Sequence, residues 1–295
     1  MRGDCLEPDN IFCGEYLSPD TDLPSTEIVF DGPEFVNDNG AIFIATYALT
    51  NIIGGDTYVD DSDISGVAIT GYKLEVQPAD FEGLTPVVDS IALPEGPHTL
   101  YFASRDYAGN TEAIKSSTIY VDGTAPGASL SLKADGASPS PWKNLREFTL
   151  SWTSPPDSSG VAGARVKFNG LAPVSNDEGG FFPGQDSLVY PAPDIVNGQN
   201  IIWVWLEDNV GNVDPATAVQ LTLRYDDILP VSTAAGPEVS KENVVAVLFT
   251  SGDEGAPETG SGLDQTVLWY RNNSMQWSSS AYVHTGLSGT FNFNT

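Results

Sequence analysis

Acidic and amide side chains gather in short, turn-like stretches where they could hold a hard cation. Asp60, Asp61 and Asp63 lie in one loop, and Asp106 and Asn110 belong to an Asp-x-x-Gly-Asn stretch further along the chain. Carboxylate and amide oxygens are the ligands that Ca²⁺ prefers. The spacing is not that of a continuous EF-hand loop, so we expect any calcium site to be assembled by the fold from separate loops.

A thinner set of the same residue types recurs about one hundred positions later, at Asp157, Asp208 and Asn212. Asp122 and Asp226 begin two further stretches and would add ligands at junctions between domains. The competing interpretation is turn chemistry, because Asp and Asn in turns hydrogen-bond to nearby backbone. Both interpretations stay open at the level of the sequence.

Catalytic chemistry has little support in the residue pattern. The two histidines, His98 and His284, lie in no metal-binding or triad-like motif, and His98 is expected at the surface, at the start of a strand. The sequence has no Gly-x-Ser-x-Gly elbow, phosphate loop or dinucleotide fingerprint. A carboxylate pair for glycosidic chemistry is not excluded by counting acids. The acids that recur do so once per repeat, however, which favours an architectural role, and we predict a non-catalytic chain.

Aromatic residues offer a second kind of binding chemistry. Trp142 is expected in a Pro/Ser loop, and Trp269, Tyr270 and Trp277 lie close together near the C-terminus. Ring faces stack on sugars, so these residues are candidates for a carbohydrate platform. The alternative is that they belong to the core, as most aromatic residues in alternating strands do.

Composition limits the class of partner. The sequence has 12 basic and 40 acidic residues, which give a net charge of −28. Such a surface repels phosphate backbones and anionic membranes, so we expect no nucleic-acid partner, and cations or basic proteins fit better. No apolar run approaches the ~20 residues of a membrane span. Cys5 and Cys13, the only cysteines, would close a small disulfide loop in an oxidising compartment or remain unbridged.

The candidate ligands sit within an internal repeat. An Asp-x-x-x-Pro motif occurs at 20–24, 122–126 and 226–230, with spacings of 122 − 20 = 102 and 226 − 122 = 104. Asp-x-x-Gly-Asn, which is typical of a hairpin turn, occurs at 106–110 and 208–212, and a Ser-Gly turn followed by Val or Leu is predicted at 65–67, 159–161 and 261–263. Three motifs in a constant order and at a nearly constant period indicate tandem units.

The segments between these motifs read as β-strands. Short runs such as 41–47 and 147–152 alternate apolar and polar residues, and no segment shows a sustained helical stripe. A period of about 100 residues with roughly seven strands is typical of an immunoglobulin-like or fibronectin type III-like β-sandwich. The predicted fold class is therefore all-β, as tandem sandwiches whose cores rely on packed aromatics such as Trp152, Trp203 and Trp205.

The Ser-Gly-Val/Leu and Asp-x-x-Gly-Asn pairing, followed by Asp-x-x-x-Pro, resembles the bacterial immunoglobulin-like repeats of secreted and cell-surface proteins. The resemblance implies an extracellular module that spaces or presents other domains. It also leaves open an accessory, carbohydrate-binding role beside the catalytic domain of a secreted hydrolase. The expected partners are a protein, a polysaccharide or neighbouring domains of the same polypeptide.

The repeat predicts domain limits of 1–22 for a tail or the end of a preceding repeat, 23–124 and 125–229 for two sandwiches, and 230–295 for a third. The Ser-Gly pair precedes the hairpin Asp by 106 − 66 = 40 and 208 − 160 = 48 residues, so the third hairpin would fall past Thr295. We therefore expect the third sandwich to lack two strands. Either the sequence is a piece of a longer array, or the open sandwich accepts a strand from a partner.

Overall fold

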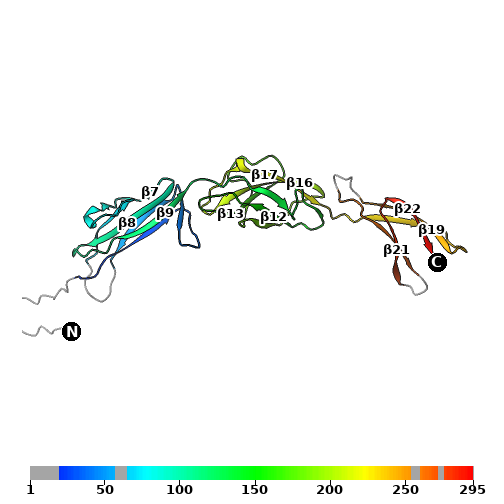
Figure 1. The fold of residues 1–295 in the computed structure, drawn as a ribbon, viewed down its shortest axis with the longest axis horizontal. Helices are drawn as coiled ribbons and strands as arrows, with labels where there is room; N and C mark the ends of the chain where they lie inside the picture. The colour runs from blue at the N-terminus through cyan, green and yellow to red at the C-terminus, as the bar shows by residue number, and fades with distance from the viewer. Residues whose placement is uncertain (1–19, 57–64, 254–259, 272–275, 295) are drawn as a thin grey trace, which may run out of the picture. The chain divides into compact units, whose positions relative to one another are not determined.

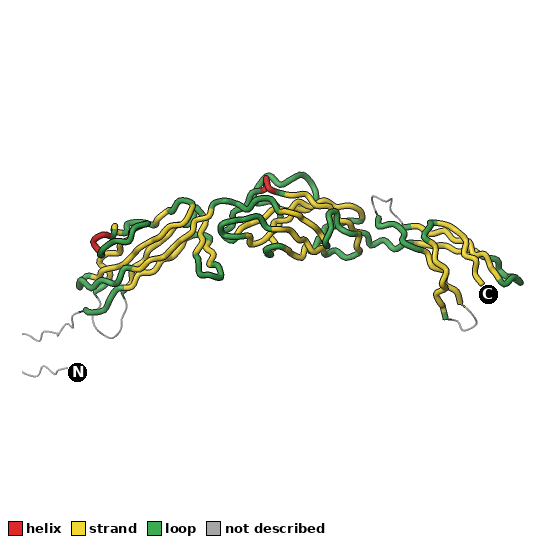
Figure 2. The backbone as a smooth tube through the Cα atoms, in the orientation of Figure 1, coloured by secondary structure: helices red, strands yellow, loops and turns green. Residues whose placement is uncertain are grey.

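The computed structural model describes residues 20–56, 65–253, 260–271 and 276–294, and almost all of its regular structure is strand (Figure 1). Figure 2 shows only short helical turns, which are the 3₁₀ turns η1 (Phe81–Gly83) and η2 (Pro215–Thr217). The chain divides into two compact units. The first ends at Thr124 and includes Asn209–Asn212, and the second comprises Ala125–Asp208 and the residues from Val213 onward.

The first unit contains two sheets. The three-stranded sheet has the order β1 (Ser25–Asp31), β4 (Leu49–Gly55) and β7 (Ile91–Ala92). The six-stranded sheet has the order β2 (Glu34–Val36), β3 (Ile42–Ala45), β9 (Lys115–Asp122), β8 (Gly96–Asp106), β5 (Val67–Leu74) and β6 (Thr85–Pro86). The pairing of β3 with β9 is parallel, and every other pair in this sheet is antiparallel.

The core of the first unit lies between these two sheets. Ile52 of the smaller sheet and Ile44, Leu100 and Ile119 of the larger one are buried in one cluster. Because neighbouring side chains on a strand point to opposite faces, the alternation seen in the sequence places one apolar row of each strand inward. The two sheets are thereby held face to face, as in a β-sandwich.

The second unit repeats this plan. A three-stranded sheet has the order β10 (Leu130–Ala134), β12 (Phe148–Thr153) and β15 (Ser187–Tyr190). A five-stranded sheet has the order β11 (Trp142–Lys143), β17 (Val219–Tyr225), β16 (Gly198–Asp208), β13 (Val161–Phe168) and β14 (Gly180–Pro183). Here β11 runs parallel to β17, the counterpart of the β3–β9 pair.

Aromatic packing in the second unit follows the prediction in part. Phe148, Leu150 and Trp152 form the buried row of β12, and Trp205 of β16 is fully buried. Trp203 and Trp205 share the outward row of β16, outside the core cluster that Ile202, Val204 and Leu206 join. Trp205 is covered there, whereas Trp203 is only half-buried, and its indole N–H donates to the Gly170 carbonyl at 3.3 Å. The prediction that Trp203 belongs to the core was therefore wrong.

The C-terminal residues of the second unit form two smaller sheets. One is three-stranded, in the order β18 (Val231–Ala235), β19 (Val244–Gly252) and β22 (Ser288–Asn294). The other is the pair β20 (Thr266–Arg271) and β21 (Trp277–His284). Phe249 of β19 and Phe291 of β22 are buried and stacked, with ring centroids 4.6 Å apart.

The predicted all-β, immunoglobulin-like fold class is confirmed, and the strands predicted at 41–47 and 147–152 overlap β3 and β12. The break between the two units falls at Thr124 and Ala125. The further division at residues 229 and 230 remains a prediction. Cys5, Cys13 and most of the predicted tail lie outside the described residues. In the part of the chain that is described, no helix has the length and apolarity to cross a membrane.

Candidate metal centre

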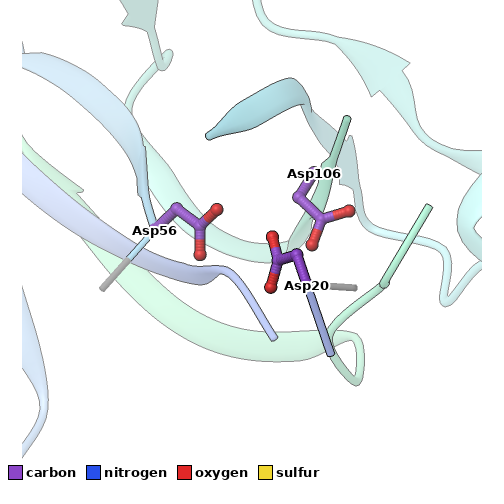
Figure 3. A group of neighbouring side chains, drawn as sticks. All are labelled: Asp20, Asp56 and Asp106. Carbon is purple, nitrogen blue, oxygen red and sulfur yellow. The ribbon is translucent and has the colours of Figure 1, made fainter. Parts of the chain in front are cut away.

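Three carboxylates from distant parts of the sequence meet at one end of the first sandwich. Asp20 precedes β1, Asp56 directly follows β4, and Asp106 ends β8. One oxygen of each lies within 4.8 Å of the others, and Figure 3 shows the three side chains converging. We call these three residues the entrance cluster, because they lie where the chain enters the sandwich.

The Ser-Gly motif builds this arrangement through its backbone. The Ser65 N–H donates to Oδ2 of Asp20 at 2.8 Å, and the Gly66 N–H donates to Oδ2 of Asp56 at 2.8 Å. Gly66 has a φ of +78°, a conformation that side-chain-bearing residues rarely adopt. The turn can therefore aim two consecutive N–H groups at two different carboxylates.

The Asp-x-x-Gly-Asn motif supplies the third carboxylate and fixes its direction. The Asn110 backbone N–H donates to Oδ1 of Asp106, and its Nδ2 donates to Oδ2, both at 2.7 Å. The same Nδ2 also donates to the Asp20 carbonyl at 3.1 Å. Asn110 thus ties the turn to the incoming chain. Asp106 is 2% exposed, so its charge has little access to solvent.

One oxygen in the entrance cluster has no partner among the described residues. Oδ1 of Asp56 is buried and accepts no hydrogen bond from any described residue. A buried carboxylate oxygen without a donor is costly, and three carboxylates this close repel one another. A bound cation would remove both costs. The residues of the entrance cluster therefore fit a hard cation with oxygen ligands.

Hydrogen bonding also favours the charged form of Asp20. Bonds from Ser65, first from its hydroxyl and then from its backbone N–H, hold the pKa of Asp20 below its ordinary value. Asp20 is therefore ionised, and available as a ligand, over the whole range around neutral pH.

The site overlaps the sequence prediction only in part. Asp106 is in the entrance cluster, and Asn110 lies beside it, but as a donor to carboxylates. Asp60, Asp61 and Asp63 lie outside the described residues.

The sequence prediction missed Asp20 and Asp56. Asp20 carries a signal, since it opens the same motif as Asp122 and Asp226, whose role at junctions was anticipated. Asp56 lies just before the acidic loop and could have been included with it.

Parts of the same bonding pattern recur in the later repeats. Within the second unit, the Gly160 N–H donates to Oδ1 of Asp157 at 3.0 Å, as Gly66 does to Asp56. Within the first unit, Nδ2 of Asn212 donates to the Asp122 carbonyl at 2.9 Å, as Asn110 does to Asp20. Asp208 is buried at the end of β16, as Asp106 is at the end of β8.

The third Ser-Gly motif also contacts two acids. The Ser261 N–H donates to Oδ2 of Asp226 at 2.6 Å, and its hydroxyl contacts Oδ2 of Asp253 at 3.4 Å. Burial by itself would raise the pKa of Asp226, but bonds from Ser261 and from the Ile228 N–H outweigh it, so the pKa is lowered. Oδ1 of Asp253 is buried with no partner among the described residues, like Oδ1 of Asp56.

The candidate aromatic platform divides between two faces. Trp269 and Trp277 are 55% and 62% exposed, whereas the Tyr270 ring lies 4.9 Å from that of Phe293, on the side of the opposite sheet. Tyr270 is therefore not on the same surface as the two tryptophans. The loop placement expected for Trp142 was wrong, because it lies in β11, half-buried, with the Arg224 guanidinium 5.9 Å from its ring centroid.

Both histidines have structural contacts. Nδ1 of His98 lies 2.8 Å from Oε1 of Glu75, and the side chain is 14% exposed, so His98 lies at the surface but is only partly exposed. This contact lowers the pKa of Glu75. His284 accepts a hydrogen bond from the Gly286 N–H at 2.9 Å and packs edge-on against Phe249.

No family model matches the sequence, and no curated protein matches it either. Among solved structures, the chain is similar to the D00–D0 domains of intimin, at 12% identity over 67% of this chain and 99% of that one, with a TM-score of 0.23. It is similar to domains 4 and 5 of the S-layer protein SbsC, at 12% identity over 68% and 97%, with a TM-score of 0.25. It is also similar to the Bacteroides ovatus protein SGBP-B, solved with a mixed-linkage heptasaccharide, at 10% identity over 92% of each chain, with a TM-score of 0.20. At these values the similarities do not assign an activity to the chain.

Proposed function

We propose that this chain is a non-catalytic, extracellular structural module whose immunoglobulin-like repeats space or present other domains. We further propose that Ca²⁺ bound at the entrance cluster fixes the incoming chain to the sandwich. The observation that carries this proposal is the convergence of the three recurring motifs at one point of the first sandwich. Residues that recur once per repeat therefore hydrogen-bond the incoming segment at Asp20 to the sandwich.

The position of each carboxylate gives the ion a mechanical role. Asp20 belongs to the incoming segment, Asp56 follows a strand of the three-stranded sheet, and Asp106 ends a strand of the six-stranded sheet. An ion held by all three would therefore tie the segment before β1 to both sheets at once. Ca²⁺ tolerates irregular sets of oxygen ligands and completes its shell with water, whereas Mg²⁺ demands near-ideal octahedral geometry. We therefore favour Ca²⁺.

Thermal unfolding of the full chain in Ca²⁺ and in chelator tests this function. A ligand that binds only the folded state adds about 2.7 kcal/mol to the free energy of unfolding at a hundredfold excess over Kd. We expect the melting temperature of the first unit to rise with Ca²⁺, and Asp56→Asn to abolish the rise. Asp38→Asn is the matched control, because Asp38 is exposed and lies outside the entrance cluster. The proposal is wrong if Ca²⁺ shifts neither the wild type nor the control.

A second candidate function is carbohydrate binding, as an accessory module of a secreted hydrolase. The observation in its favour is that the third repeat differs from the first two at one position on the outward row of β20. Seven residues after the Ser-Gly glycine, the first two repeats have Lys73 and Lys167, and the third has Trp269. Trp277 of β21 lies diagonally across from Trp269, since Trp269 pairs with Ser279 and Arg271 pairs with Trp277. Two exposed rings would offer stacking faces to a sugar chain.

Calorimetric titration with a panel of soluble neutral polysaccharides separates the two functions. Binding that is lost in both Trp269→Ala and Trp277→Ala, and retained in Trp142→Ala, would favour the carbohydrate-binding module. No heat with any polysaccharide, together with stabilisation by Ca²⁺, would favour the structural module.

A further inference from the structure

The two ring nitrogens of His98 both face hydrogen-bond acceptors. Nε2 lies 2.8 Å from the Pro94 carbonyl oxygen, and Nδ1 lies 2.8 Å from Oε1 of Glu75. A neutral imidazole has one donor nitrogen and one acceptor nitrogen, whereas an imidazolium has two donors. Because a carbonyl oxygen can only accept, Nε2 must carry a proton in this arrangement.

The charge of Glu75 decides what Nδ1 carries. Its pKa lies below the ordinary value, first because of the bond with His98 and then because of a bond from the Thr99 N–H. Glu75 is therefore an ionised carboxylate around neutral pH and has no proton to donate. Nδ1 is then the donor of this pair as well, so both bonds are made together only when the His98 ring is an imidazolium.

The neighbouring strands add no second charge to the ring. His98 is on the inward row of β8, at the end of the sandwich, two residues before the buried Leu100. The residue opposite it on β9 is Ile119, and the last residue of β5 is Leu74. β7, in the smaller sheet, has no titratable residue. Within the described part of the chain, Glu75 is thus the carboxylate that pairs with the ring.

Glu75 occupies a strained turn that this pair helps to hold. Its φ is +64°, and the Val76 N–H donates to the Leu74 carbonyl at 2.8 Å, which is the hydrogen bond of a γ-turn. A positive φ is costly for a residue with a side chain and persists where the surrounding bonds enforce it. The Glu75 N–H donates to the Thr99 carbonyl at 2.8 Å, and the His98 ring holds the Glu75 carboxylate. Loss of the imidazolium would therefore loosen the turn after β5.

The same ring also holds the turn before β8. Pro94 accepts from Nε2 of the ring, and the next residue, Glu95, accepts from the Thr124 hydroxyl at 2.6 Å. Asp122 is the other acid at this end, and it accepts from the Thr124 N–H at 3.1 Å. Thr124 ends the main segment of the first unit. His98 thereby connects the turn after β5 with the turn to which the outgoing segment is bonded.

We propose that His98 is a pH-sensitive latch of the first sandwich, closed when its ring is an imidazolium and open when the ring is neutral. A neutral ring has a single proton and keeps only one of the two bonds. The stability that the latch adds is therefore present at mildly acidic pH and lost as pH rises through the range, about pH 5 to 8, in which histidine ordinarily changes charge. Such a latch would make a structural module firmer at its outgoing end in acidic surroundings.

A double-mutant cycle on the full chain, at constant Ca²⁺ and low salt, tests the proposal. The variants are His98→Gln, Glu75→Gln and the two together. The readout is the protection factor of the Val76 amide, which corrects for the intrinsic pH dependence of exchange. We expect a coupling of about fivefold in local opening at about pH 5.5, and of less than about twofold at about pH 8.5. In ¹⁵N spectra, both ring nitrogens of His98 should carry protons at the lower pH.

The ion pair between Arg105 and Glu82 is the matched control. Nη2 of Arg105, on β8, lies 2.7 Å from Oε1 of Glu82, so this pair also ties the segment after β5 to β8. Arginine keeps its charge over this pH range. The coupling between Arg105→Gln and Glu82→Gln, measured at the Leu84 amide, should therefore be equal at the two pH values.

Four results would overturn the proposal. The coupling between His98 and Glu75 could be absent at both pH values, equal at both, or larger at the higher one, and the ring could carry a single proton at the lower pH. A control coupling that changes with pH in the same way would also overturn it, because pH would then act on the whole segment and not through His98.

Discussion

Nδ2 of Asn110 donates to the backbone carbonyl of Asp20 at 3.1 Å, across 90 positions of sequence. Asn212 makes the same bond to Asp122 at 2.9 Å, across the same 90 positions. In both Asp-x-x-Gly-Asn motifs of the described residues, the final Asn therefore bonds to the first residue of an Asp-x-x-x-Pro motif. The two motifs therefore act together, the Asn side chain holding the segment that opens with the Asp.

Replacing Asn110 with Ala should loosen this fastening. The change removes the side-chain donor to both Asp20 and Asp106, and the loss of two partly buried bonds should lower stability by about 1–3 kcal/mol. Urea unfolding of the full chain, with amide exchange of Ser65 and Asn110 as local probes, measures the effect. Asn39→Ala is the control, because within the described part of the chain only the backbone N–H of Asn39 forms a hydrogen bond, to Oδ1 of Asn37. Equal stability in the two variants would contradict the assigned role of Asn110.

The lowered pKa of Asp20 predicts acid sensitivity at the same place. A carboxyl group whose pKa falls on folding adds stability above its unfolded pKa of about 3.9, and this stability is lost as pH drops through the lower, folded value. Because Ser65 causes the shift, Ser65→Ala should move the Asp20 pKa back toward its ordinary value. Titration of the carboxyl carbon by NMR measures both. An unchanged pKa in the variant would show that the Ser65 hydroxyl is not the cause.

Trp205 is predicted to dominate the stability of the second sandwich. The side chain is fully buried, so Trp205→Ala should cost about 3–5 kcal/mol. Its indole N–H has no partner among the described residues, so Trp205→Phe should cost clearly less. Trp277→Ala, at a 62% exposed position, should change stability by no more than about 0.5 kcal/mol. Guanidinium unfolding compares the three variants, and a Trp205→Ala cost below that of Trp277→Ala would contradict this assignment.

Local pattern predicted most of the fold. The alternation of Phe148, Leu150 and Trp152 indicated a strand with one buried row, and the structure places all three inside. The glycines of the Ser-Gly motif were expected at turns, and Gly66, Gly160 and Gly262 have φ of +78°, +81° and +76°. Both signals depend on neighbouring residues alone, which is why they can be read without knowing the tertiary structure.

The site residues and strand that the sequence analysis failed to predict depend on contacts with distant parts of the chain. Asp20 and Asp56 join Asp106 only because two strands from different sheets end beside the incoming segment. Trp142 lies in a strand only because β17, some eighty residues later, pairs with it. Tyr270 is a different case, since strand parity alone separates it from Trp269 and could have been applied to the sequence.

The central claim is that the recurring motifs build a Ca²⁺ site at the entrance cluster. Amide hydrogen exchange of Ser65, Gly66 and Asn110 tests it most directly, because these N–H groups donate to the three carboxylates. The full chain would be measured at neutral pH in Ca²⁺ and in chelator. We predict that exchange at all three amides slows together when Ca²⁺ is added, and that Asp56→Asn removes the effect. Exchange at these amides that is the same with and without Ca²⁺ would contradict the claim.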